Sequence, residues 1–139
     1  MLRNIIRIVS LSAVLLALGC GGPQEYVVTG TERSAGTDGT ILLEEIEGNQ
    51  MLSVELEHLP DPGRISQGAT VYIVWVKPDG GTPTMVGRLE HDADDRTARM
   101  RATTPHTSFE VLITAEADAT ATHPSEIIVV RQQVGGSSD

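Results

Sequence analysis

Near the centre of the chain the sequence reads Thr70-Val-Tyr-Ile-Val-Trp-Val-Lys77, and this stretch decides the fold. It is a short run of β-branched and aromatic residues that is apolar on both of its faces. Such a run is typical of a strand in the interior of a sheet, because both of its faces are covered there. The segment before it alternates instead, with Leu52, Val54 and Leu56 separated by polar residues, which predicts a strand buried on one face only.

Further strands are expected on both sides of this centre, with turn residues between them. They are expected at residues 26–32, 41–47, 51–57, 85–90, 96–103, 108–115 and 126–132. Gly48-Asn49 predicts a two-residue hairpin turn, and His91–Asp95 reads as an acidic loop. Many short strands without a long helical period predict an all-β sandwich. The alternative at Ile41–Glu47 is a short helix, with Leu42, Leu43 and Ile46 forming its apolar stripe.

The first 20 residues have the pattern of an export signal. Arg3 and Arg7 form a positive start, an apolar segment follows from Ile8 to Leu18, and this segment is too short for a membrane-spanning helix. Ala17-Leu-Gly-Cys20 resembles the lipobox of bacterial lipoproteins. The resemblance implies a signal-peptide helix in residues 1–19, cleavage between Gly19 and Cys20, and a diacylglycerol on the sulfur of Cys20.

The alternative for Cys20 is an ordinary cleaved signal that leaves a free thiol. An exposed lone thiol is a liability in an oxidising compartment, so we expect the lipid anchor. Residues 20–25 then form the lipidated cysteine and a flexible tether, residues 26–132 the β-sandwich domain, and residues 133–139 a disordered tail. Gly21 stands where an Asp retains Gram-negative lipoproteins at the inner membrane, which favours the outer membrane of a bacterial envelope.

The charge of the chain excludes one class of partner. The formal net charge is −9, and it becomes −11 without residues 1–19, which carry two arginines and no acid. Nucleic-acid binding depends on Lys and Arg neutralising phosphates, so we expect no nucleic-acid partner. The expected partners are the membrane, through the lipid on Cys20, and an unknown envelope protein.

Several motifs beyond residue 68 resemble a known family. They are Tyr72-Ile-Val-Trp75, Pro78-Asp-Gly-Gly81, Val86-Gly-Arg-Leu89, Phe109–Glu116, and Pro124-Ser125 before Ile128-Val129. Over residues 68–130 they resemble the extracytoplasmic C-terminal domain of anti-sigma-K factors. The resemblance implies an immunoglobulin-like antiparallel β-sandwich of about seven or eight strands that senses or binds rather than catalyses. The chain carries no zinc-type anti-sigma domain, so we do not expect it to bind a sigma factor itself.

The sequence offers no set of residues typical of catalysis or metal binding. The four histidines, at 58, 91, 106 and 123, lack the spacing of zinc ligands, and His58 is interpreted as a histidine at a strand end. No Gly-x-Ser-x-Gly elbow is present. The acids Asp92, Asp94 and Asp95 suggest calcium, but the mid-loop Gly and closing Glu of an EF-hand are absent. We therefore predict no enzyme activity, cofactor or metal.

The remaining candidates are contact residues. Tyr72, Trp75 and Phe109 are expected in the core, although Trp75 is out of phase with Tyr72, so one of the two could reach a surface. Loops around Asp61–Gln67, Asp79–Thr84 and His91–Asp95 are expected to form the contact surface. Its candidate residues are Trp75, Asp79, His91, Asp92, Asp94 and Asp95. The predicted function is a lipid-anchored, non-enzymatic interaction or sensing domain; the alternative is an envelope lipoprotein that binds a small molecule or calcium.

Overall fold

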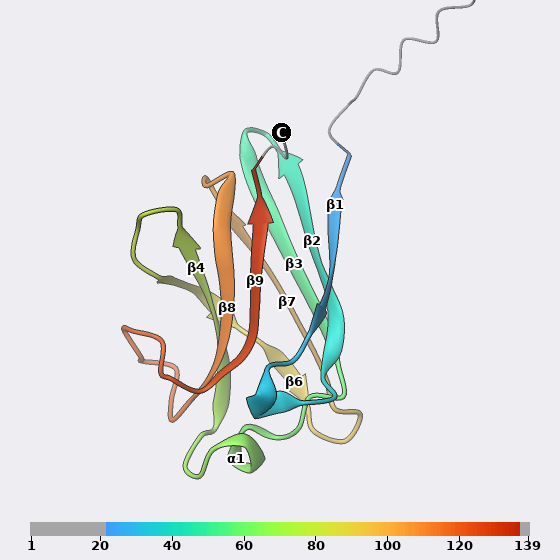
Figure 1. Ribbon diagram of the computed structural model, residues 1–139, viewed down its shortest axis with the longest axis vertical. Coiled ribbons are helices and arrows are strands. Elements are labelled where there is room, and N and C mark those ends of the chain that lie inside the picture. The colour runs from blue at the N-terminus through green and yellow to red at the C-terminus, as the bar shows by residue number, and fades with distance from the viewer. Residues whose placement is uncertain (1–21, 137–139) are drawn as a thin grey trace, which may run out of the picture.

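A computed structural model describes residues 22–136 (Figure 1). The expected signal peptide, its cleavage site after Gly19 and the expected lipidation site Cys20 lie outside the described residues. The described strands are β1 (Gln24–Thr29), β2 (Asp38–Ile46), β3 (Asn49–Glu57), β4 (Val71–Pro78), β5 (Thr84–Arg88), β6 (Glu90–Asp92), β7 (Thr97–Thr104), β8 (Ser108–Glu116) and β9 (Ile128–Gly135). The short helices are η1 (Glu32–Ser34) and α1 (Pro62–Ile65). Among residues 22–136, no helix is long and apolar enough to cross a membrane.

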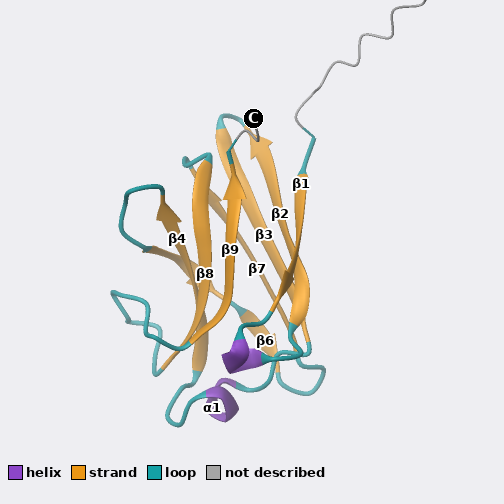
Figure 2. Cartoon of the chain, in the orientation of Figure 1, coloured by secondary structure: helices purple, strands orange, loops and turns teal. Residues whose placement is uncertain are grey.

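The strands form two antiparallel sheets that pack face to face (Figures 1 and 2). One sheet has the order β1-β2-β3-β7-β6 and the other has the order β5-β4-β8-β9. Immunoglobulin domains place strands ABED in one sheet and CFG in the other. The strands β2, β3, β7 and β6 take the ABED places, and β4, β8 and β9 take the CFG places. The expected immunoglobulin-like all-β sandwich is therefore confirmed.

The described chain has more strands than the seven or eight expected, for two reasons. Strand β1 adds an N-terminal neighbour to β2. The single strand expected at 85–90 is instead two strands, with β5 in one sheet and β6 in the other. His91 and Asp92 thus belong to β6 rather than to a loop, because they pair with β7.

The core lies between the sheets, as the alternation predicted. Leu52, Val54 and Leu56 of β3 are buried there. Strand β4 is confirmed as an interior strand, between β5 and β8. Its inner face gives Tyr72 to the main core, whereas Trp75 on its outer face packs in a second small cluster with Ile73 and Leu112. Ala121, in the β8–β9 loop, lies against this cluster, which explains why both faces of β4 are apolar.

The β2–β3 hairpin differs from the sequence expectation in two ways. Residues 41–46 are a strand, so the helix alternative is wrong. The turn consists of Glu47 and Gly48 rather than Gly48 and Asn49, because Asn49 already pairs with Ile46. Both turn residues have positive φ, 52° at Glu47 and 84° at Gly48, which is the requirement of a type I′ turn.

The sheet extends beyond the expected domain limits at both ends. Strand β1 begins at Gln24, inside the segment expected to be a tether. Strand β9 continues to Gly135, inside the segment expected to be a disordered tail. Val134 is fully buried and pairs with Phe109 of β8, so burial of this side chain holds the end of the chain in the sheet.

The sandwich has two different ends, separated by the length of its strands (Figure 1). The chain enters β1 at the N-terminal end, which also carries the β2–β3 turn, the β4–β5 loop (79–83) and the β7–β8 loop (105–107). The opposite end, here called the loop end, carries the β3–β4 connection (58–70) with α1, the β6–β7 turn (93–96) and the β8–β9 loop (117–127). Because β1 runs antiparallel to β2, the chain enters at the end away from the longest loops.

Candidate interaction surface

Two of the three loops expected to form a contact surface meet at the loop end. The backbone N–H of Leu59 donates to the carbonyl of Arg96 at 2.8 Å, which joins the β3–β4 connection to the β6–β7 turn. His91 Nε2 donates to the carbonyl of Leu59 at 2.9 Å. The His91 ring also packs edge-on against Tyr72, with 5.5 Å between ring centroids. His91 is therefore half-buried and holds the two loops together rather than offering itself to a partner.

Tyr72, a core residue of β4, holds the β3–β4 connection in place through its hydroxyl group. Its hydroxyl donates to the carbonyl of Pro60 at 2.5 Å. Burial, and secondly the charge of Asp61, raise the pKa of Tyr72 above its ordinary value, so the side chain stays neutral and remains a donor. Asp61 in turn caps α1 by accepting from the N–H of Gly63 at 3.2 Å. The loop end is thus a rigid support for its exposed side chains.

The acidic side chains of the β6–β7 turn divide into two kinds. Asp92 is used within the turn, because its Oδ1 accepts from the N–H groups of Asp94 and Asp95 at 3.0 and 3.1 Å. The side chains of Asp94 and Asp95 are exposed at the loop end. The β8–β9 loop has a similar feature in Asp118, whose pKa is lowered by hydrogen bonds from the hydroxyl and N–H of Thr120.

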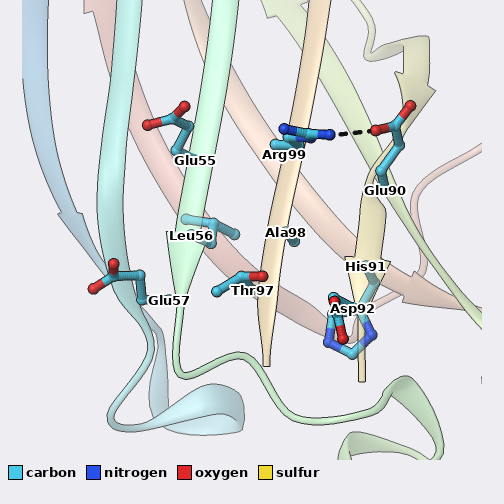
Figure 3. Close-up of a pocket in the computed structure, with 9 residues that line it drawn as sticks. All are labelled: Glu55, Leu56, Glu57, Glu90, His91, Asp92, Thr97, Ala98 and Arg99. Carbon is cyan, nitrogen blue, oxygen red and sulfur yellow. Dashed lines mark hydrogen bonds and ion pairs between the residues drawn. The ribbon is translucent and has the colours of Figure 1, made fainter. Parts of the chain in front are cut away.

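An open groove of about 450 Å³ continues this acidic surface along the outer face of β3, β7 and β6 (Figure 3). It is lined by Glu55, Leu56, Glu57, Glu90, His91, Asp92, Thr97, Ala98 and Arg99. Figure 3 shows Arg99 directed to Glu90, and their Nε and Oε2 atoms are 3.4 Å apart. Four carboxylates and one guanidinium line the groove, and only Glu90 is paired with Arg99. This excess of negative charge favours cationic groups of a partner.

Two of the expected contact residues do not belong to this surface. Trp75 is fully buried beneath the β8–β9 loop, which corrects its assignment as a contact residue. Asp79 lies at the N-terminal end, where its carboxylate accepts from the Ser108 hydroxyl at 2.7 Å and from the Gln133 amide at 3.4 Å. It ties the β4–β5 loop to β8 and β9. The six expected residues therefore do not form one site.

The sequence analysis missed one cluster, in which Asp38, Glu57 and His58 meet at the loop end. Asp38 and His58 are 20 positions apart in the chain, and no motif spacing connects them. Only the pairing of β2 with β3 places Asp38 opposite Glu57. The strand expected from 41 to 47 did not extend back to Asp38, so no local pattern indicated this contact.

No protein-family model matches the chain, and no curated protein is significantly similar to it. The resemblance to anti-sigma-K factors over residues 68–130 therefore stays a prediction.

Proposed function

We propose that this protein is a lipid-anchored, non-enzymatic domain of the bacterial envelope that presents its loop end to an envelope protein. The lipobox-like Ala17–Cys20 supports the anchor. The position of β1 supports the orientation, because only residues 21–23 separate Cys20 from Gln24. An extended residue spans at most about 3.3–3.6 Å, so a lipid on Cys20 holds the N-terminal end close to the bilayer.

The observation that carries the proposal is the direction of β1. Without β1, the first strand would be β2, which starts at the loop end with Asp38. With β1, the chain enters at the other end, and the β3–β4, β6–β7 and β8–β9 loops project away from the membrane. Loops on a rigid sandwich are a common place for recognition. The exposed carboxylates of Asp94 and Asp95 and the acidic groove favour a partner with a basic surface.

Two properties of the chain support an interaction role over catalysis. The loop-end histidine His91 is used in packing and in a backbone hydrogen bond. Asp92 is occupied by backbone N–H groups of its own turn. In the anti-sigma-K factors that residues 68–130 resemble, this domain is thought to sense or bind, which agrees with the proposal. If the host is Gram-negative, Gly21 favours the outer membrane.

The test is a capture experiment in crosslinked native envelopes. The full-length protein is compared with Cys20→Ala, which removes the only thiol and leaves the described domain intact. Mass spectrometry of the N-terminal peptide checks for a diacylglycerol on Cys20. We expect the lipid, and one protein recovered in stoichiometric amount with the anchored form and not with Cys20→Ala. An unmodified Cys20, or the absence of any specific protein in both samples, would contradict the proposal.

A further inference from the structure

We propose that Asp38, Glu57 and His58 form a binding site for a divalent transition-metal ion, with Zn²⁺ as the reference ion. One ligand atom from each of these residues lies within 4.8 Å of the other two. His58 Nδ1 is 2.7 Å from Asp38 Oδ1. The site lies at the loop end and is independent of the proposed protein partner.

The backbone brings the three side chains to one place. Asp38 and Glu57 are directly paired residues of β2 and β3, so both project from the outer face of the sheet. His58 follows Glu57, and regular alternation would send it to the opposite face. Its φ of 57° ends the strand and turns the ring toward Asp38 instead. Positive φ is uncommon in non-glycine residues, and histidine is one of the residue types that adopt it more often than most.

Buried contacts hold the segments that carry the ligands. The Thr37 hydroxyl donates to the carbonyl of His58 at 3.0 Å, and it also shares a 2.5 Å hydrogen bond with the hydroxyl of Ser34. Thr37 and Ser34 are both buried. Leu59, the residue after His58, is fully buried, and its backbone N–H donates a hydrogen bond to the carbonyl of Arg96. A rigid backbone lowers the cost of ordering the three ligands on metal binding.

The ligand set determines which metal fits. Zn²⁺ binds imidazole nitrogen and carboxylate oxygen at about 2.0–2.2 Å, so tetrahedral ligand atoms lie roughly 3.4 Å apart. His58 Nδ1 and Asp38 Oδ1 are 2.7 Å apart, and all three ligand atoms lie within 4.8 Å of one another. The side chains of His58 and Asp38 are exposed, so small rotations can bring the ligand atoms to the tetrahedral spacing. Three protein ligands leave the fourth position to water. Ca²⁺ takes 6–8 oxygen ligands, so this trio favours Zn²⁺ over Ca²⁺.

The experiment is a titration of the full-length protein, purified in detergent with an affinity tag free of histidine, with ZnCl₂ and separately with CaCl₂. Calorimetry measures affinity and stoichiometry. The variants are His58→Ala, Asp38→Asn and Glu57→Gln. The matched control is His123→Ala, which removes another exposed histidine at the same end of the sandwich. Circular dichroism melts check that each variant is folded, and Asp38→Asn keeps the side-chain shape.

We expect one Zn²⁺ per chain, unchanged affinity in His123→Ala, and an affinity at least tenfold lower in His58→Ala and in Asp38→Asn. CaCl₂ should not displace Zn²⁺. The proposal is overturned if the protein binds no Zn²⁺ in the millimolar range. It is also overturned if folded His58→Ala and Asp38→Asn bind Zn²⁺ as the unaltered protein does, or if His123→Ala weakens binding as much as His58→Ala.

Discussion

Trp75, the only tryptophan in the chain, donates its indole N–H to the hydroxyl of Thr114 at 2.8 Å. Thr114 donates in turn to Glu116 Oε2 at 2.5 Å, and this oxygen also accepts from the N–H of Ser125 at 2.9 Å. The first three side chains are buried. This series of hydrogen bonds fastens the β8–β9 loop to the outer face of the four-stranded sheet.

The first prediction concerns this network. Thr114→Val keeps the shape of the side chain but leaves the buried N–H of Trp75 without its acceptor. We expect the free energy of unfolding to fall by about 1–3 kcal/mol, with a change in the emission of Trp75. Urea unfolding followed by fluorescence measures both quantities. Thr103→Val, at an exposed position of β7, is the control and should change little; an equal effect in both variants would contradict the role of Thr114.

The second prediction is alkaline destabilisation through Tyr72. Burial raises its pKa, whereas tyrosine in the unfolded chain ionises near pH 10, so the folded state binds more protons above about pH 10. The free energy of unfolding therefore falls as the pH rises beyond that value. Tyr72→Phe should be less stable near neutral pH, by about 1 kcal/mol for the lost bond to Pro60, but should lose less stability in alkali.

Urea unfolding at about pH 8 and pH 11 tests this difference. Tyr26→Phe is the control, because it leaves Tyr72 in place and should keep the alkaline loss of stability. If Tyr72→Phe loses as much stability between the two pH values as the unaltered protein, Tyr72 is not the source of the effect.

The third prediction concerns the β2–β3 turn. Glu47 has a φ of 52°, a conformation that costs an ordinary L-residue roughly 1–2 kcal/mol, and Asn-Gly is the preferred pair for a type I′ turn. Glu47→Asn should therefore raise the free energy of unfolding by up to about 1 kcal/mol. Glu45→Asn removes the same charge from an exposed position in β2 and should give no gain. A similar rise in melting temperature for both variants would point to charge instead of turn geometry.

The fourth prediction uses two glycines with different surroundings. A Cβ at Gly39 would lie 2.0 Å from the carbonyl oxygen of Glu55, whereas at Gly63 the nearest atom is 3.6 Å away. Gly39→Ala forces β2 and β3 apart and should cost about 1–3 kcal/mol or more. Gly63→Ala, in the short helix α1, should be close to neutral. Melting curves of the two variants measure the difference, and equal stability would contradict the close approach at Gly39.

The sequence predicted those parts of the fold that depend on alternation. The alternation in β3 predicted that one face of this strand is buried, the face that carries Leu52, Val54 and Leu56. The apolar run around Trp75 predicted that β4 lies in the interior of a sheet. The same pattern could not say what covers the outer face of β4, because the covering Ala121 belongs to a loop without any periodicity. The I′ turn was misplaced by one residue because glutamate is not a typical residue for the conformation of Glu47.

The candidate surface was harder to predict than the fold. His91 donates a hydrogen bond to the carbonyl of Leu59, which is distant from it in sequence. Asp79 lies at the N-terminal end of the sandwich, a full strand length away from the acidic β6–β7 turn. A residue's polarity indicated exposure, but it did not indicate at which end of the sandwich the residue lies. That information comes from strand order, which local patterns do not contain.

The most direct test of the proposed orientation is site-specific photocrosslinking in intact envelopes. A photoreactive amino acid replaces Asp94 or Asp118 at the loop end and, in matched variants, Glu47 or His106 at the N-terminal end; all four positions are exposed. The proposal predicts that both loop-end positions crosslink the same envelope protein and that Glu47 and His106 do not. Crosslinks to that protein from the N-terminal end alone, or no protein crosslink from either loop-end position, would contradict it.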